Sequence, residues 1–172
     1  ELPPIVLATL RRKMVELSVE IGAGAVWANA SRNDFNNSVA DIPEDVQGSD
    51  FFIGNMIPTV IDDDRNAGAE RNRKTLQGYV ALPNYRNYWK QAGYTEEMEG
   101  IEAALEAGDR DRVLTCMSDE WLSNATLYGS QDEVRQGVEE WFDQGCKTPI
   151  LVPSSTSGGQ MHAIQELFDC FS

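Results

Sequence analysis

The chain has 172 residues, 41% of them hydrophobic, which is enough for one sizeable core but too short for two ordinary domains. Its 28 acidic and 14 basic residues give a net charge of −14, so most of its surface would repel a nucleic acid backbone or an anionic membrane. Neither partner is therefore expected. The sequence has no apolar run near the ~20 residues of a membrane-spanning helix and opens with no secretory leader, which predicts a cytoplasmic protein.

The first thirty residues predict a β-α-β unit. Residues 5–9, IVLAT, form a short apolar run after two prolines, which cannot donate to a strand ladder and so mark its entrance. Met14, Leu17 and Ile21 then recur at helical spacing, and glycines end the helix before a second apolar run at 25–29. A parallel unit of this kind buries both faces of its strands and needs neighbours on both sides.

Two more strands and a long helical stretch follow. Residues 31–50 are polar and interrupted by proline and glycine, so we expect a loop with one or two helical turns. The apolar runs at 51–61 and 149–153 predict the third and fourth strands, and the residues from 64 to 128 predict helices without a strand among them. Helices between all four strands favour parallel pairing with right-handed crossovers.

The later helices carry apolar stripes. In GSQDEVRQGVEEWFDQG, Ser130 and Glu133 have capping-box spacing, and the stripe predicts that Trp141 and Phe142 lie against the strands. Two shorter stripes fall in the long helical stretch: Met98, Ile101 and Leu105, and Met117, Trp121 and Leu122. The last expected helix, from about residue 159 to 171, has four apolar residues on one face: Met161, Ile164, Leu167 and Phe168.

Four segments stand in the order and spacing found in the C-terminal half of the bacterial-luciferase-like family: PPIVLATLRRKMVELSVEIGAGAV, TVIDDDRNAG, GYVALPNYRNYWKQAGY and YGSQDEVRQGVEEWFDQGCKTPILVP. The chain resembles this family over nearly its whole length. The family comprises flavin-dependent monooxygenases, together with reductases and dehydrogenases that use a deazaflavin coenzyme. The resemblance implies an α/β fold, the C-terminal half of a (β/α)8 TIM barrel, with four parallel strands and a helical insertion between the last two.

The resemblance also implies how the chain is organised. Residues 1–172 would form a single half-barrel domain, with the insertion at about 64–128, and the first four strands of the barrel would lie outside this sequence. The chain starts with Glu and not Met, which agrees with a fragment. Half a barrel has two open strand edges and one uncovered face, so we expect a homo-oligomer or a complex with the missing N-terminal half.

Two functions remain open at this point. One is a flavin-dependent oxidoreductase that acts on a small-molecule substrate, with FMN as the first choice of cofactor and the deazaflavin coenzyme as the second. In such an enzyme the cofactor carries the redox chemistry, which would explain why the sequence shows no catalytic dyad. The other is a non-catalytic half-barrel that self-associates and binds no cofactor, because a fold does not fix a function.

The turn after the first strand, TLRRK, is the first candidate for a cofactor site. Barrel chemistry lies at the C-terminal ends of the strands, and a helix that begins there points free N–H groups at an anion. In the family this loop helps to hold the cofactor phosphate, usually with a Gly-Pro pair where this sequence has Arg11 and Arg12. Two guanidinium groups could hold a phosphate instead, within reach of Thr9 and Leu10. Alternatively, both arginines are ordinary solvated residues of a first helical turn.

Trp27 and Asn29, at the end of the second strand, would face the same mouth of the barrel. Trp27 could flank an isoalloxazine ring, or it could belong to the core, as tryptophans on buried strands often do. Gly24, just before them, matches a glycine of the family. The resemblance therefore adds Trp27 and Asn29 to the cofactor-binding candidates.

The remaining polar residues give weaker indications of a functional site. Asp62 to Asp64 are expected to cap a helix, since a hard cation needs oxygen ligands from several segments. No metal site is predicted, and His162, the only histidine, has no orienting partner in the sequence. The loop SSTSGG at 154–159 is a second, weaker anion candidate. The three cysteines fit neither a disulfide framework nor a zinc motif and are expected to be buried or bystander thiols.

Overall fold

The ten-residue strand β3 organises the sheet of this computed structural model, which describes residues 3–172. The first half of β3 pairs with β2, its end pairs with β4, and β5 runs along its other edge, while β1 pairs with β2 alone. All of these pairings are parallel. The strands are β1 (Val6–Ala8), β2 (Gly24–Ala28), β3 (Phe52–Ile61), β4 (Leu127–Gly129) and β5 (Thr148–Pro153).

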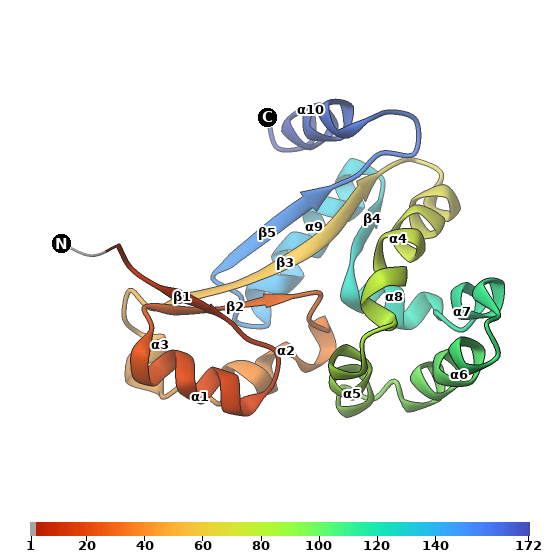
Figure 1. Cartoon of the computed structure of the whole chain (residues 1–172). Coiled ribbons are helices and arrows are strands. Elements are labelled where there is room, and N and C mark those ends of the chain that lie inside the picture. Colours follow the sequence, from red (N-terminus) through yellow and green to blue (C-terminus); the bar gives the residue numbers. More distant parts are fainter. Residues whose placement is uncertain (1–2) are drawn as a thin grey trace.

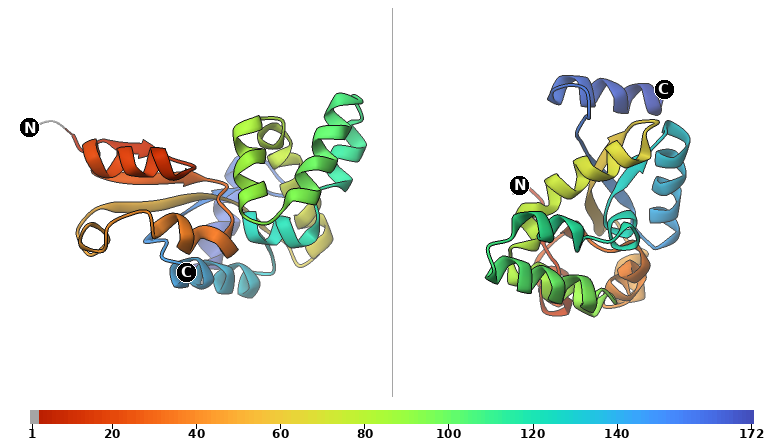
Figure 2. Two further views of the ribbon diagram at one scale, coloured as in Figure 1. Left: turned by 90° about the horizontal axis from the view of Figure 1, so that it is seen from below. Right: turned by 90° about the vertical axis from the view of Figure 1, so that its right-hand side faces the viewer.

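Helices connect the strands and cover one face of the sheet. In Figure 1, α1 to α3 lie below β1 and β2, and α9 lies behind β3 and β5. Figure 2 shows α4 to α8 as a group at the opposite end of the molecule from β1. None of the helices in the described part is long and apolar enough to cross a membrane. The helices are α1 (Arg12–Ile21), α2 (Arg32–Val39), α3 (Glu44–Gln47), α4 (Arg65–Val80), α5 (Pro83–Gln91), α6 (Thr95–Glu106), α7 (Arg110–Thr115), α8 (Asp119–Ala125), α9 (Gln131–Asp143) and α10 (Gln160–Cys170).

The four strands predicted from the sequence are all present, as β1, β2, β3 and β5. The prediction missed β4, which lies where only helices were expected, because its three residues belong to no longer apolar run, whereas the three residues of β1 lie within the run at 5–9. Residues 31–50 are more helical than expected, since they hold both α2 and α3. Phe35 and Val39, one turn apart, are buried on α2 and account for that helix.

The caps predicted from the sequence are confirmed. Ser130 Oγ accepts the N–H of Glu133, and the Glu133 carboxylate accepts the N–H of Ser130 at 2.8 Å, so α9 has a complete capping box. Asp64 accepts the N–H groups of Asn66 and Ala67 at 3.0 and 3.2 Å and caps α4. Each cap satisfies N–H groups that have no partner inside the helix.

Three aromatic rings join the sheet to the helices behind it. Trp27 on β2 meets Phe35 on α2 edge to face, with ring centroids 5.1 Å apart, and Phe35 meets Trp141 on α9 at 5.4 Å. All three are fully buried. The prediction for Phe142 was wrong, because it is 45% exposed. Successive residues of an α-helix point about 100° apart around its axis. Phe142, the residue after Trp141, therefore lies outside the stripe formed by the buried residues of α9.

Apolar side chains stay exposed at both ends of the sheet and on one of its faces. The predicted stripes of α1 and α10 face solvent in part: Ile21 is 63% and Phe168 is 68% exposed. On β3, Met56 is exposed between two buried neighbours, so it lies on the face that the helices leave uncovered. Val152 of β5, opposite Pro58, has the same orientation and is also exposed.

We expect Trp141→Ala to lower the free energy of unfolding by about 3–5 kcal/mol, because it deletes a fully buried aromatic side chain and its contact with Phe35. Phe142→Ala is the matched control on the next residue and should cost less than about 1 kcal/mol. Urea denaturation of both variants checks this. Equal losses would mean that α9 is rotated from the orientation described.

We expect Cys146 and Cys170 to react with a thiol reagent only after unfolding, because both are buried. Burial raises the pKa of the Cys146 thiol to about 11, so little thiolate forms near neutral pH. Cys116 is half-buried and should react first. Counting thiols with a colorimetric disulfide reagent at pH 8, with and without denaturant, gives the measurement; rapid labelling of Cys146 in the native protein would contradict it.

Candidate functional site

The loop that leaves β1 is fixed to β2. The N–H of Thr9 donates to the carbonyl of Val26 at 2.8 Å, and the Thr9 hydroxyl donates to the same oxygen at 3.3 Å. Thr9 is buried, and Leu10 packs half-buried against the core. The start of α1 is therefore held at the carboxyl end of the first two strands, where a parallel barrel carries its active site.

The N-terminus of α1 is an electropositive end. Arg11 is its N-cap residue and no side chain caps it. The first hydrogen bond of the helix runs from the N–H of Met14 to the carbonyl of Arg11 at 2.9 Å. The N–H groups of Arg12 and Lys13 come before it and therefore have no acceptor within the helix. The first turn has no acidic residue. Three basic side chains thus add to the positive end of the helix dipole.

The two arginines differ in their surroundings. Arg12 Nε lies 2.8 Å from Glu16 Oε1 and 3.8 Å from Asp41 Oδ1. The hydrogen bond that Arg12 donates to Glu16, together with the negative charge of that carboxylate, raises the pKa of Arg12 above its ordinary value. Arg11 is exposed and makes no ion pair with any of residues 3–172. Of the two candidates, Arg11 is the one whose guanidinium has no carboxylate to displace.

Trp27 does not lie beside the N-terminus of α1. It is 0% exposed and points to the helix side of the sheet, against Phe35. Side chains alternate along a strand, so a residue that contacts the outer helices cannot also face the interior of the barrel. The interpretation of Trp27 as a flank of the cofactor ring is corrected accordingly: it is a core residue, the alternative that the sequence left open.

Asn29, which follows β2, has an unusual backbone conformation. Its φ of 56° is in the left-handed region, and its N–H donates to the carbonyl of Met56 at 2.9 Å. The side chain is 3% exposed, and its Nδ2 has no hydrogen-bond partner within the described residues. A buried donor without a partner is costly, so a ligand acceptor at this place would remove a penalty.

The second anion candidate has the wrong charge. The loop 154–159 borders a cavity of about 560 Å³ that contains five carboxylates and one guanidinium. The charged groups are Asp62, Asp63, Asp132, Glu166, Asp169 and Arg135. These surroundings disfavour a phosphate. His162 is half-exposed beside this loop, with Nε2 3.1 Å from Glu166 Oε1. No group of three or more His, Cys, Asp or Glu in the described part is arranged to hold a metal ion.

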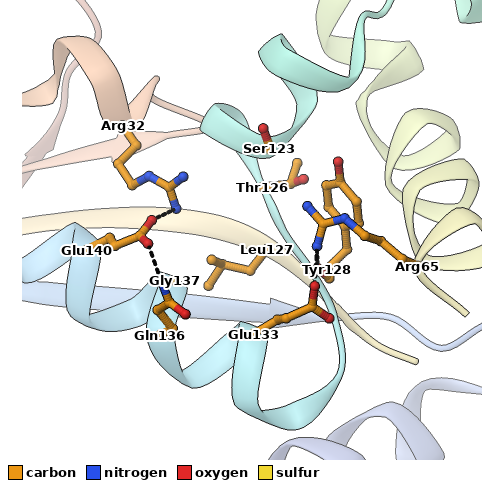
Figure 3. A pocket seen from close by; sticks show the side chains of 10 residues that line it. All are labelled: Arg32, Arg65, Ser123, Thr126, Leu127, Tyr128, Glu133, Gln136, Gly137 and Glu140. Atoms are coloured by element: carbon orange, nitrogen blue, oxygen red, sulfur yellow. Dashed lines mark hydrogen bonds and ion pairs between the residues drawn. The ribbon is translucent and has the colours of Figure 1, made fainter. Parts of the chain in front are cut away.

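Sequence reasoning missed a polar pocket of about 280 Å³ between α2, α4, α8 and α9 (Figure 3). Arg32 and Arg65 enter it from opposite sides, and each is paired with a glutamate of α9: Arg32 with Glu140 at 2.8 Å, Arg65 with Glu133 at 2.9 Å. Arg65 also lies over the ring of Tyr128, 4.5 Å from its centroid. The only signal in the sequence is the seven-residue spacing of the two glutamates, which places them two turns apart on one face.

A family model described as luciferase-like monooxygenase matches residues 1–148. The chain belongs to the luciferase-like monooxygenase family. This confirms the resemblance stated from the sequence, and the first two strands with the α1 turn lie within the matched part. A comparison with curated protein sequences finds no significant match.

Two solved structures share the fold of this luciferase-like chain. The coenzyme F420-dependent tetrahydromethanopterin reductase from Methanopyrus kandleri is 18% identical, with a TM-score of 0.74, and the match covers 95% of this chain and 48% of the reductase. An F420-dependent secondary alcohol dehydrogenase, in complex with an F420-acetone adduct, is 11% identical, with a TM-score of 0.64 and coverage of 99% and 48%. The chain spans about half the length of both. The α/β half-barrel predicted from the sequence is confirmed.

Proposed function

We propose that this chain is the C-terminal half of a flavin-type oxidoreductase that acts on a small-molecule substrate. Family membership supports the reaction class. The observation that carries the site is the basic, uncapped N-terminus of α1 at the carboxyl end of β1. In a chain of net charge −14, few places attract the phosphate of a cofactor, and this one combines N–H groups, the helix dipole and Arg11.

The residues of this edge fit part of a cofactor. Arg11 and the first N–H groups of α1 would hold the phosphate, and the unpartnered Nδ2 of Asn29 would donate to a polar atom of the same molecule. When bound, a flavin or deazaflavin supplies the redox chemistry. This chain would bind and orient the cofactor. Trp27 is not placed to pack against the cofactor ring, so the residues that do so would come from other strands.

We propose the deazaflavin coenzyme ahead of FMN. The sequence favoured FMN, but both structural relatives named above depend on coenzyme F420, a deazaflavin. Titration with both cofactors distinguishes them, because each has its own absorbance and fluorescence.

We further propose that the open side of the sheet is covered by four more parallel strands. The solved relatives are about twice as long, and Met56 and Val152 expose apolar surface on the face of the sheet that the helices leave uncovered. β1 and β5 each have one edge without a strand in the described part. A second copy of this chain could cover the open side of the sheet instead. That arrangement agrees with the alternative of a non-catalytic half-barrel that self-associates.

We expect Arg11→Ala to weaken cofactor binding by roughly tenfold to hundredfold, the effect of losing one charged hydrogen bond. Arg12→Ala is the matched control: its guanidinium is already bound to Glu16 and Asp41, so the affinity should stay within about twofold of the parent. Titrations of FMN and the deazaflavin coenzyme, on this chain assembled with the other four strands, measure both. Equal affinities of parent and Arg11→Ala would remove Arg11 from the site, and no binding of either cofactor to the parent would overturn the proposed function.

We expect the chain alone, at micromolar concentration, to show a mass above that of its 19.1 kDa monomer. The uncovered face and both ends of the sheet expose apolar side chains, which soluble monomers rarely leave in contiguous patches. Light scattering after gel filtration measures the mass. A stable 19.1 kDa particle would show that the face needs no cover.

A further inference from the structure

Helix α5 binds the segment that leaves β2. The indole N–H of Trp89 donates to the carbonyl of Asn29 at 3.1 Å, and the hydroxyl of Tyr88 accepts the N–H of Ser31 at 2.9 Å. Both side chains are buried, at 0% and 2% exposed. The partners stand 60 and 57 positions apart in the sequence, so these bonds join the helical stretch to the sheet. In Figure 1, α5 lies beside the end of β2.

The same segment is held from β3. The N–H of Asn29 donates to the carbonyl of Met56 at 2.9 Å, and the N–H of Ala30 donates to Asn55 Oδ1 at 3.2 Å. Residues 29–31 therefore lie between β3 on one side and α5 on the other, with every N–H bonded. A left-handed non-glycine residue such as Asn29 persists only where its surroundings determine it, and such residues cluster at functional sites.

Helix α5 is itself firmly placed. Glu102 on α6 accepts from Arg86 Nε at 3.1 Å and from Lys90 Nζ at 2.7 Å, one turn apart on α5. These two bonds lower the pKa of Glu102, so the carboxylate stays charged at neutral pH. Trp89 also meets Trp121 of α8 edge to face at 4.9 Å. The position of α5, and with it that of residues 29–31, is set by the packing of α4 to α8.

We propose that Tyr88 and Trp89 are positioning residues: they hold residues 29–31 at the carboxyl end of β2 in the conformation that places Asn29 for the cofactor. A helix far along the chain then determines the geometry of a site on β2. The effect on the cofactor rests on the proposed function, whereas the effect on residues 29–31 can be measured without any cofactor.

The first test is hydrogen exchange of backbone amides, followed by NMR, on the 172-residue chain and its Tyr88→Phe variant. Removing the hydroxyl should speed exchange at Ser31 by about tenfold, since the N–H loses its acceptor, while Asp62, bonded to the carbonyl of Gly129, should be unchanged. Tyr79→Phe is the matched control, because no described residue accepts from or donates to its hydroxyl. Unchanged exchange at Ser31 in Tyr88→Phe would overturn the proposal.

The second test is titration of the assembled barrel with FMN and the deazaflavin coenzyme. Tyr88→Phe and Trp89→Phe should weaken binding by about tenfold, while Tyr79→Phe should match the parent. Parent affinity in both variants, together with faster exchange at Ser31, would show a structural role only and overturn the positioning role. If the parent binds neither cofactor, the proposed function fails, and the exchange result alone then decides whether α5 holds residues 29–31.

Discussion

Strand β3 is the constraint on which the other elements depend. Its first half bonds to β2, its end bonds to β4, and its other edge bonds to β5, so every part of the sheet except β1 is attached to it directly. The ten residues of β3 give it the length to pair with three strands at staggered positions. Gly54 stands where β5 begins, and a Cβ there would lie 2.5 Å from the ring of Phe52. The length of β3 therefore decides which strands can pair with it, and the glycine at position 54 leaves room for the ring of Phe52.

Local patterns predicted much of this architecture. The apolar runs located β1, β2, β3 and β5, and the Ser130–Glu133 spacing located the start of α9. These features depend on neighbours in sequence, where period and capping chemistry are direct signals. The family resemblance supplied what periodicity could not, namely that the strands form half of a barrel. It also indicated the turn at Arg11 as a site.

Several errors at the candidate sites share a physical cause, because they depended on contacts distant in sequence. Arg12 differs from Arg11 partly through Asp41, which follows α2 and lies 3.8 Å from Arg12 Nε, although its closer partner, Glu16, stands only four residues away. The loop 154–159 resembled an anion site in the sequence, but carboxylates of the β3–α4 loop, α9 and α10 surround it in the fold. Trp27 was ambiguous because a strand pattern gives the alternation of faces but not which face meets the helices. The bonds from α5 to residues 29–31 had no local signal at all.

The candidate anion site and the open side of the sheet are physically linked. β1, which leads through Thr9 to α1, is three residues long and pairs only with β2. Elements with few hydrogen bonds and exposed side chains open at low cost in free energy, so this edge is the part of the sheet with the least support. A strand added beside β1 would stabilise the loop that holds α1, and by linkage a cofactor bound to that loop would favour the strand. The end of β2 has other support, since β3 and α5 both bond to residues 29–31. The two halves of the candidate site thus differ in support: Asn29 is held by bonds from β3 and α5, whereas Arg11 follows a short edge strand that pairs with β2 alone.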